Sequence, residues 1–347
     1  MFLDERLREC VSILFVDDIH ANVIKRMAIG SVFFVMKSLT GEDEPEEAIG
    51  NHVDNAHEYF TAYAVTACHV IQEFAANAPI YIRINKRDGT SYDHPTDPDD
   101  WIKDVPNDIA IFELIDGNIP LSKIDIALRA LAFQTLASDN YMDSIPVRAG
   151  YEVFFLGLFA GHPGKGRAQP IIRFGNISLM RHDKIDAYLS HADALMGRIT
   201  EIDAYLVEAR SWGGQSGSPV LFYHPPLKAD IEPLWIRFQL PIVLGVTHGQ
   251  YERESQLIGN TPLVSAGIAM VIPAIRIREL IMSKDLQDKR AAALIEAKKT
   301  PSKDAPMPRA ASLKQEEGIG EDGFLDALKR ASLKLSEPES EKTQTSE

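Results

Sequence analysis

One segment of this sequence is well suited to covalent chemistry, and a serine stands at its centre. Ser216 lies within SWGGQSGSPV, residues 211–220, with glycines before it at 213 and 214 and Gly217 after it. Glycine permits positive φ and a close approach of substrate, so the backbone N–H groups of Gly214 and Ser216 could point at one developing oxyanion. Acyl transfer requires that geometry. Glycine-serine turns are common, however, so the segment needs partners before it predicts a nucleophile.

Two such partners precede the serine, each beside an apolar run. His69 lies near the end of AYAVTACHV, and Asp108 begins DIAIFEL. A serine hydroxyl is a weak nucleophile at neutral pH, so a histidine must take its proton and a carboxylate must fix the histidine tautomer. Considered alone, His69 would be interpreted as a histidine of the core and Asp108 as a turn residue before a strand. Together with Ser216, they predict a catalytic triad.

The segments TACHV, NDIAIFEL and GGQSGSPV, in this order, resemble the three catalytic segments of the chymotrypsin-like (trypsin-like) serine peptidases. The separations between His69, Asp108 and Ser216 suit that family. GYEVFFLGLFAGHPGKG resembles the strand that opens the second barrel of the family, LGVTHG the strand that pairs with substrate, and SAGIAMVIPAIRIREL the last strand and terminal helix. The resemblance covers about residues 25–285.

The resemblance implies a role for each of these residues. Ser216 is the expected nucleophile, His69 the general base and then acid, and Asp108 the residue that orients the imidazole. The expected oxyanion hole uses Gly214 and Ser216. Gln215 stands where the zymogen-activated digestive branch carries an aspartate that pairs with a newly cut N-terminus. The likeness is therefore closer to the bacterial and intracellular trypsin-like peptidases.

Substrate-binding residues follow from the same resemblance. They are expected to be Arg210, Thr247, His248, Gly249 and Gly267. Backbone pairing with Thr247 and Gly249 would add the substrate as an extra strand. A guanidinium from Arg210, at the family's specificity position, would favour an acidic substrate side chain. The alternative is that Arg210 points to solvent or pairs with its neighbour Glu208.

The elements that must position these residues are mostly short strands. From about residue 28, runs rich in β-branched and aromatic residues alternate with Gly, Pro, Asp and Asn, which is typical of barrels or sandwiches. With the resemblance, this predicts an all-β fold: a chymotrypsin-like double six-stranded β-barrel. The helical spacing of Leu3, Leu7 and Leu14 predicts an N-terminal helix, and Pro273 opens a segment that favours a C-terminal helix.

We therefore divide the chain into four segments. These are an N-terminal helical segment (1–24), a trypsin-like serine peptidase domain (25–285, with the first barrel at about 25–120 and the second at about 146–272), a helical extension (286–300) and a tail (301–347). The tail is rich in Pro, Ser, Lys and Glu, which predicts disorder. Within it, GFLDALKRASLKL could present an apolar helical face, so the tail is a candidate docking segment for a protein partner.

Composition excludes several classes of partner. There are 36 Lys and Arg against 50 Asp and Glu, a net charge of −14, whereas a surface that holds nucleic acid must be basic. No apolar run approaches the roughly 20 residues of a membrane span, and we expect no membrane partner. Asp4 and Glu5 argue against a secretory signal, and two cysteines cannot form a disulfide framework, which favours a cytoplasmic location.

No cofactor or metal is expected, because the cluster His52, Asp54, His57 and Glu58 lacks a recognised ligand spacing. The sequence thus predicts a serine endopeptidase that cuts a polypeptide substrate through an acyl-enzyme. One alternative is a latent or inactive barrel that binds a protein partner through its cleft and C-terminal tail. Another is an acyl hydrolase that acts on esters, since the same triad serves both reactions.

Overall fold

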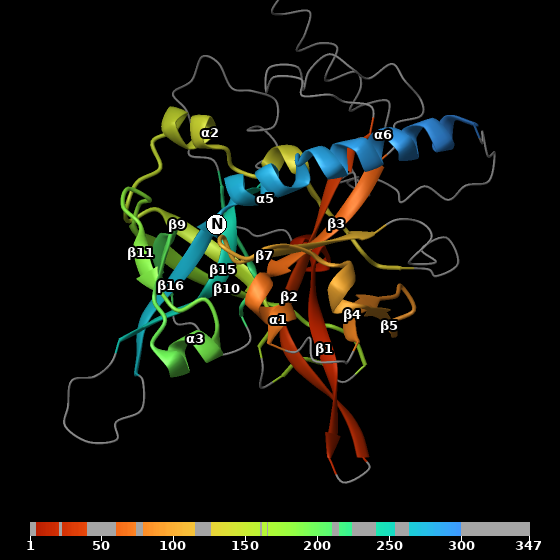
Figure 1. The fold of residues 1–347 in the computed structure, drawn as a ribbon, viewed down its shortest axis with the longest axis horizontal. Helices are drawn as coiled ribbons and strands as arrows, with labels where there is room; N and C mark the ends of the chain where they lie inside the picture. Colours follow the sequence, from red (N-terminus) through yellow and green to blue (C-terminus); the bar gives the residue numbers. More distant parts are fainter. Residues whose placement is uncertain are drawn as a thin grey trace, which may run out of the picture.

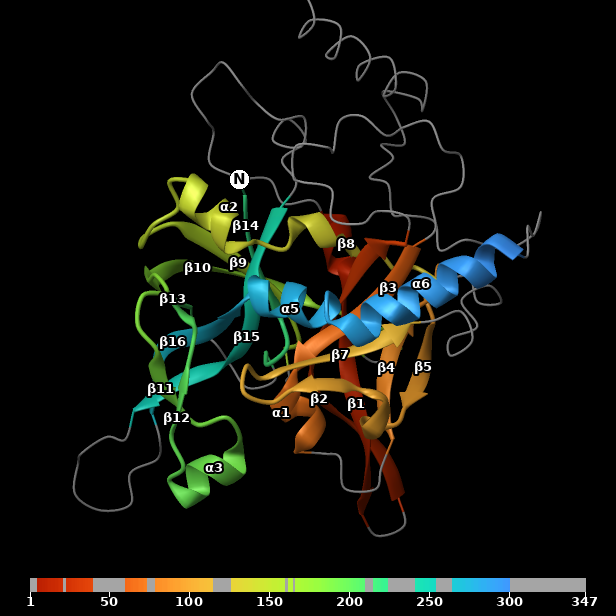
Figure 2. The same ribbon diagram turned by 45° about the horizontal axis from the view of Figure 1, so that its top comes forward.

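The computed structural model of the 347-residue chain describes residues 5–20, 23–39, 60–73, 79–114, 126–159, 162–164, 166–209, 215–223, 241–253 and 264–299. Two β units stand side by side, one in the red and orange part of the chain and one in the green and teal part (Figure 1). Helices from the C-terminal end cross one end of both units (Figure 2). No helix in the described ranges is long and apolar enough to cross a bilayer.

The first unit is an eight-stranded sheet. Its strands are β1 (Val11–His20), β2 (Val23–Ser38), β3 (Phe60–Ala67), β4 (Ile80–Asn85), β5 (Ser91–Thr96), β6 (Ile102–Asp104), β7 (Ile109–Leu114) and β8 (Leu131–Ala132). They pair in the order β5-β4-β1-β2-β3-β7-β6, and β8 pairs with β2 in parallel. The sequence of β4, IYIRIN, buries every second residue, as a strand with one covered face must.

The second unit is a closed six-stranded barrel. Its strands are β9 (Glu152–Gly157), β10 (Ile171–Leu179), β13 (Tyr205–Glu208), β14 (Pro219–Tyr223), β15 (Pro241–Arg253) and β16 (Val264–Pro273), closed in the order β10-β13-β16-β15-β14-β9. A separate two-stranded ribbon pairs β11 (Ile185–Ala187) with β12 (Thr200–Ile202). Closure leaves this barrel without an unpaired sheet edge.

Short helices connect the strands, and the longest one ends the described chain. The α-helices are α1 (Cys68–Gln72), α2 (Asp139–Ser144), α3 (His191–Met196), α5 (Ala274–Ile281) and α6 (Lys284–Lys299); 3-10 helices lie at Glu5–Cys10, Pro98–Asp100 and Phe133–Thr135. Helix α6 returns from the second unit to the first, where the buried Arg290 guanidinium contacts the Tyr63 hydroxyl of β3 at 2.9 Å.

The predicted all-β class is confirmed, with two β units of which the second is a closed barrel and the first an open sheet. The second unit has the predicted six strands in a closed ring, while the first has eight strands. A C-terminal helix follows the last strand directly, as predicted from Pro273, which is the N-cap of α5. The predicted disordered tail, 301–347, lies outside the described residues.

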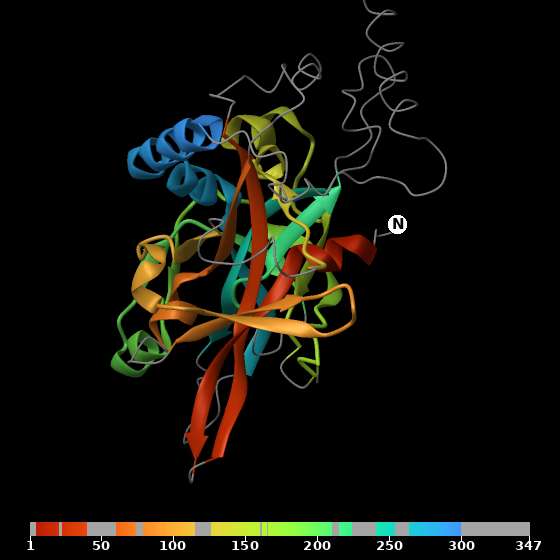
Figure 3. The same cartoon turned by 90° about the vertical axis from the view of Figure 1, so that its right-hand side faces the viewer.

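The predicted helical segment 1–24 is wrong beyond its first turns. A 3-10 helix at Glu5–Cys10 gives way to β1 at Val11, and Figure 3 shows β1 and β2 as a long hairpin that projects from the body. Adjacent residues Ile13 and Leu14 are both fully buried, in different apolar clusters. A strand covered on both faces is apolar at every position, so its spacing also satisfies a helical pattern.

Candidate active site

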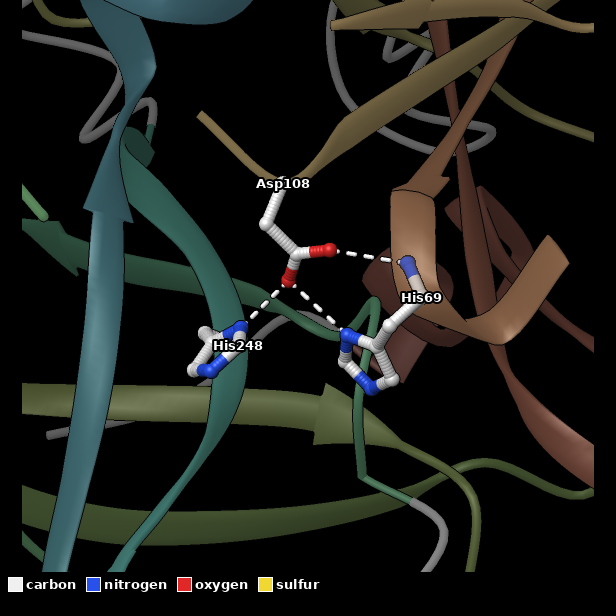
Figure 4. Close-up of side chains that lie close together, drawn as sticks. All are labelled: His69, Asp108 and His248. Carbon is white, nitrogen blue, oxygen red and sulfur yellow. Dashed lines mark hydrogen bonds and ion pairs between the residues drawn. The ribbon is translucent and has the colours of Figure 1, made fainter. Parts of the chain in front are cut away.

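Asp108 holds His69 in place at two points. Helix α1 begins directly after β3, so His69 stands in its first turn, and its backbone N–H donates to Asp108 Oδ1 at 2.8 Å. The ring Nδ1 lies 2.9 Å from Asp108 Oδ2 (Figure 4). Because the carboxylate accepts, Nδ1 carries the proton and Nε2 is left as the basic nitrogen. This is the tautomer that general base catalysis by histidine requires.

The backbone at Asp108 is unusual. Its φ is +50°, and among the described residues it is the non-glycine residue with positive φ. Aspartate tolerates this left-handed region better than most residues. The Asp108 N–H donates to the Val105 carbonyl at 3.1 Å, and its carbonyl accepts the Cys68 N–H at 3.0 Å. These bonds fix the carboxylate at the start of β7, beneath α1.

The pKa values of Asp108 and His69 are shifted in the directions that favour an ionised aspartate and a basic histidine. Burial would raise the pKa of Asp108, but the charges of His69 and His248 and hydrogen bonds from both rings hold that pKa well below its ordinary value. For His69, burial would lower the pKa, but the Asp108 charge and hydrogen bond, with a smaller contribution from Glu73, raise it above its ordinary value.

Ser216 occupies a tight turn that enters β14. Its carbonyl accepts the Ser31 N–H of β2 at 2.9 Å, which ties the turn to the first unit. Its hydroxyl donates to the backbone carbonyl of His248 at 2.9 Å. Among the described residues, no hydrogen bond joins Ser216 to His69. The hydroxyl must therefore rotate about χ1 before it can give its proton to the imidazole.

Position 217, directly after Ser216, has no room for a side chain and must be glycine. Gly217 has φ +83°, and a Cβ there would lie 2.2 Å from the Ser31 carbonyl oxygen and 2.2 Å from Thr66 Oγ1. Its N–H donates to the Thr247 carbonyl at 2.9 Å. The turn therefore packs with its backbone directly against β2 and β3 of the first unit. Only a residue without a side chain permits that approach.

A second histidine completes the arrangement around Asp108. In β15, Thr247 pairs with Val271 and Gly249 with Met270, so His248 is the extra residue of a β-bulge. A bulge redirects a side chain out of the regular alternation of the strand. The ring Nδ1 of His248 contacts Asp108 Oδ2, the same oxygen that His69 meets (Figure 4). Its Nε2 lies 3.0 Å from the Tyr188 carbonyl oxygen.

His69, Asp108, Ser216 and His248 thus come together from elements that are far apart in the sequence. The sequence assigned His248 to the substrate pocket through its neighbours in LGVTHG, and it contained no signal for a bulge. Its imidazole lies against Asp108 instead, 5.2 Å from the His69 ring between centroids. Sequence reasoning missed this contact because a bulge depends on the pairing of two distant strands.

Of the other predicted site residues, the structure describes some and leaves others outside the described ranges. Thr247 uses both its backbone groups inside the protein, since its N–H donates to Ser218 and its carbonyl accepts from Gly217, which leaves its N–H unavailable to a substrate strand. Gly267 has φ +73°, and its carbonyl accepts the Ala209 N–H. Arg210 and Gly214 lie outside the described residues.

The donor atoms of His69, Asp108 and His248 lie within 4.8 Å of one another, a grouping that raises the question of a metal. Ligands of a tetrahedral zinc ion lie roughly 3.3 Å apart, given bonds of about 2.0–2.1 Å. The 2.9 Å between His69 Nδ1 and Asp108 Oδ2 is shorter and is the length of a hydrogen bond. We therefore assign protons, and no metal, to these contacts.

Cys68 adjoins His69 in the sequence but takes no part in this chemistry. It is buried and free, and burial, followed by the charge of Asp108, raises the pKa of its thiol to about 12. A thiol with that acidity holds its proton at neutral pH and is a poor nucleophile. Among the described residues around Asp108, the serine is therefore the better nucleophile.

No protein-family model matches the sequence. No significant match was found among the curated proteins. The fold is similar to that of three crystal structures. They are the apo MamO protease domain from Magnetospirillum magneticum (13% identity, 81% of this chain and 100% of that chain, TM-score 0.43), Deg5 (15%, 81% and 98%, 0.39) and an M. tuberculosis protease in its active form (15%, 79% and 81%, 0.37).

Proposed function

We propose that this chain is a serine endopeptidase that hydrolyses peptide bonds of a polypeptide substrate through an acyl-enzyme. The observation that carries the proposal is the double attachment of His69 to Asp108, through its backbone N–H and through Nδ1. This attachment leaves the His69 Nε2 lone pair free to act as a base. Ser216 supplies the hydroxyl, from a turn whose carbonyl and following glycine are fixed by the protein.

In the proposed reaction, Ser216 Oγ attacks the substrate carbonyl carbon while His69 Nε2 takes the hydroxyl proton. The negative charge that forms on the carbonyl oxygen is stabilised by the backbone N–H groups of Ser216 and Gly214. His69 then gives its proton to the departing amine as the C–N bond breaks. A water molecule, deprotonated by His69, hydrolyses the ester and restores Ser216. Asp108 remains ionised throughout.

The test is covalent labelling with a fluorophosphonate probe, together with cleavage of an unstructured protein such as casein. The wild-type chain should be labelled and should cut, and both Ser216→Ala and His69→Ala should abolish labelling. Labelling that survives Ser216→Ala would place the nucleophile elsewhere. Labelling together with cleavage of esters but not of peptides would favour an acyl hydrolase instead.

A second candidate is a latent barrel that binds a protein partner through its cleft and tail. The observation that favours it is the direction of the Ser216 hydroxyl, which donates to the His248 carbonyl and not to His69. This reading predicts no labelling of the wild type. It also predicts partner capture that survives Ser216→Ala and is lost when residues 301–347 are deleted. We place either activity in the cytoplasm, because a chain with two cysteines cannot form a disulfide framework.

A further inference from the structure

His248 faces a hydrogen-bond acceptor on each of its two ring nitrogens. Nε2 lies 3.0 Å from the backbone carbonyl oxygen of Tyr188, which can only accept. Nδ1 contacts Asp108 Oδ2, a carboxylate oxygen. A neutral imidazole has one N–H and one lone pair, so it can satisfy one of these acceptors and would point its lone pair at the other. The contacts require both nitrogens to carry protons.

The second proton belongs on His248 and not on Asp108. An unperturbed carboxyl group is more acidic than imidazole by about 2.6 pKa units, so a proton shared between the two resides on the ring. Asp108 also accepts from the His69 backbone N–H and from His69 Nδ1, and both bonds favour the ionised carboxylate. A protonated His248 would then form a buried pair with an ionised Asp108. Its side chain is 5% exposed and that of Asp108 2%.

We propose that His248 is a positively charged positioning residue that fixes Asp108 and lowers the proton affinity of His69. This inference rests on the proposed peptidase function and concerns the control of the same triad. Asp108 is held between two rings that approach the same carboxylate oxygen. The charge of His248 also offsets the charge of Asp108 that would otherwise stabilise a protonated His69.

The groups that face His248 come from four elements. Asp108 precedes β7, His69 lies on α1, the Tyr188 carbonyl follows β11, and the Ser216 hydroxyl bonds the His248 carbonyl itself. The nearby Cys68 thiol is uncharged, as shown above. When catalysis protonates His69, two imidazolium rings meet one carboxylate.

The second cation predicts a change in the acidic limb of the pH dependence of kcat/KM. That limb reports protonation of His69, and it lies at a lower pH than in a triad without the second cation. His248→Asn keeps an N–H donor for Asp108 without the charge. It should move the acidic limb up by about one pH unit.

Kinetics of further variants distinguish the proposed role of His248 from a merely structural or pocket-lining role. His248→Ala should lower kcat about 100-fold with KM nearly unchanged, because Asp108 and His69 lose their alignment. His248→Asn should restore part of that loss. Exposed His182→Asn is the control and should leave the acidic limb in place. An acidic limb that does not move in His248→Asn, or an effect of His248→Ala confined to KM, would overturn the proposal.

Nitrogen-15 NMR of the histidine rings tests the proposal without catalysis. The full chain carrying Ser216→Ala is labelled at histidine, and His248→Asn assigns the resonance. We expect both His248 nitrogens to be protonated at pH 7 and His69 to carry its proton on Nδ1. A His248 ring with one protonated nitrogen would refute the proposal even in an active peptidase. If the wild type proves inactive, the peptidase function fails and this spectrum alone decides the charge of His248.

Discussion

Gly217 shows how one residue without a side chain sets the position of the candidate nucleophile. It combines a positive φ with direct backbone packing against Ser31 and Thr66. Gly217→Ala should therefore reduce fluorophosphonate labelling of Ser216 by about 100-fold or more, because the turn must move away from the first unit. It should also lower the free energy of unfolding by more than the roughly 1–3 kcal/mol that backbone strain costs.

Gly89 provides the matched control for that variant. Its φ of +86° is close to that of Gly217, but a Cβ there would meet nothing within 4 Å. In parallel urea titrations of the two variants, Gly89→Ala should thus lose only the free energy of unfolding that backbone strain costs. Its fluorophosphonate labelling should be unchanged. Equal losses of stability in the two variants would mean that the close contact at Gly217 relaxes without cost.

The acidity of Asp108 predicts a pH dependence of stability. Its folded-state pKa lies below its unfolded value, so ionised Asp108 stabilises the fold above an unfolded pKa of about 3.9, and this contribution is lost as pH falls through the folded pKa. The wild type should therefore be more stable than Asp108→Asn at about pH 5. That difference should narrow progressively below pH 4, as measured by urea unfolding at each pH. A difference that widens below pH 4 would contradict the assignment.

At the residue scale, the sequence predicted that three side chains would meet, but it did not predict that His248 would join them. The order and flanking residues of His69, Asp108 and Ser216 predicted a triad, because each residue type has a chemical reason to be there. Two of these side chains, His69 and Asp108, are joined in the structure. The contact of His248 with Asp108 depends on a bulge at one position of β15, which local sequence does not reveal.

At the scale of elements, α6 attaches the end of the described chain to the first sheet. Arg290 donates to the Tyr63 hydroxyl at 2.9 Å and to the Ile281 carbonyl at 2.7 Å, and its side chain is buried. Arg290→Ala would leave the Tyr63 hydroxyl, whose atom is also buried in β3, without this donor. We expect a loss of roughly 1.5–3 kcal/mol in the free energy of unfolding, measured by urea denaturation.

Exposed Lys289 on the same helix turn is the control for charge. Lys289→Ala should change stability by less than about 0.5 kcal/mol, since it removes a cation but no buried bond. Tyr63→Phe should reproduce a part of the Arg290→Ala loss, and the double variant should cost less than the sum of the two. Additive losses would show that the Arg290–Tyr63 contact contributes nothing to attaching α6.

At the scale of elements, the prediction from sequence was wrong at the N-terminus, where a strand stands in place of the expected helix. The apolar residues near the N-terminus fit a helix and a doubly buried strand equally well, and the contacts of β1 with both β2 and β4 decided between them. Pro273 gave a firmer prediction, because its fixed φ suits a helix start and ends a strand. Patterns restricted by backbone geometry were thus more reliable than patterns of apolarity alone.

At the scale of the whole molecule, the two β units are joined next to Ser216 by a small buried network of hydroxyls. Ser31 of β2 accepts the Leu158 N–H at 2.8 Å through its Oγ and the Ser218 hydroxyl at 3.0 Å. The Ser31 N–H binds the Ser216 carbonyl, and its own carbonyl accepts from Thr66. The position of Ser216, the candidate nucleophile, relative to His69 therefore depends on how the two units dock.

Substitutions at the two serines should separate docking from local packing. Ser31→Ala leaves the buried Leu158 N–H without its acceptor and should cost roughly 1–3 kcal/mol in urea unfolding, whereas Ser218→Ala removes only a donor to Ser31 and should cost less. Because docking sets the distance between His69 and Ser216, Ser31→Ala should also slow fluorophosphonate labelling more than Ser218→Ala does. Equal rates with unequal stabilities would mean that the network holds the units together without aligning the site.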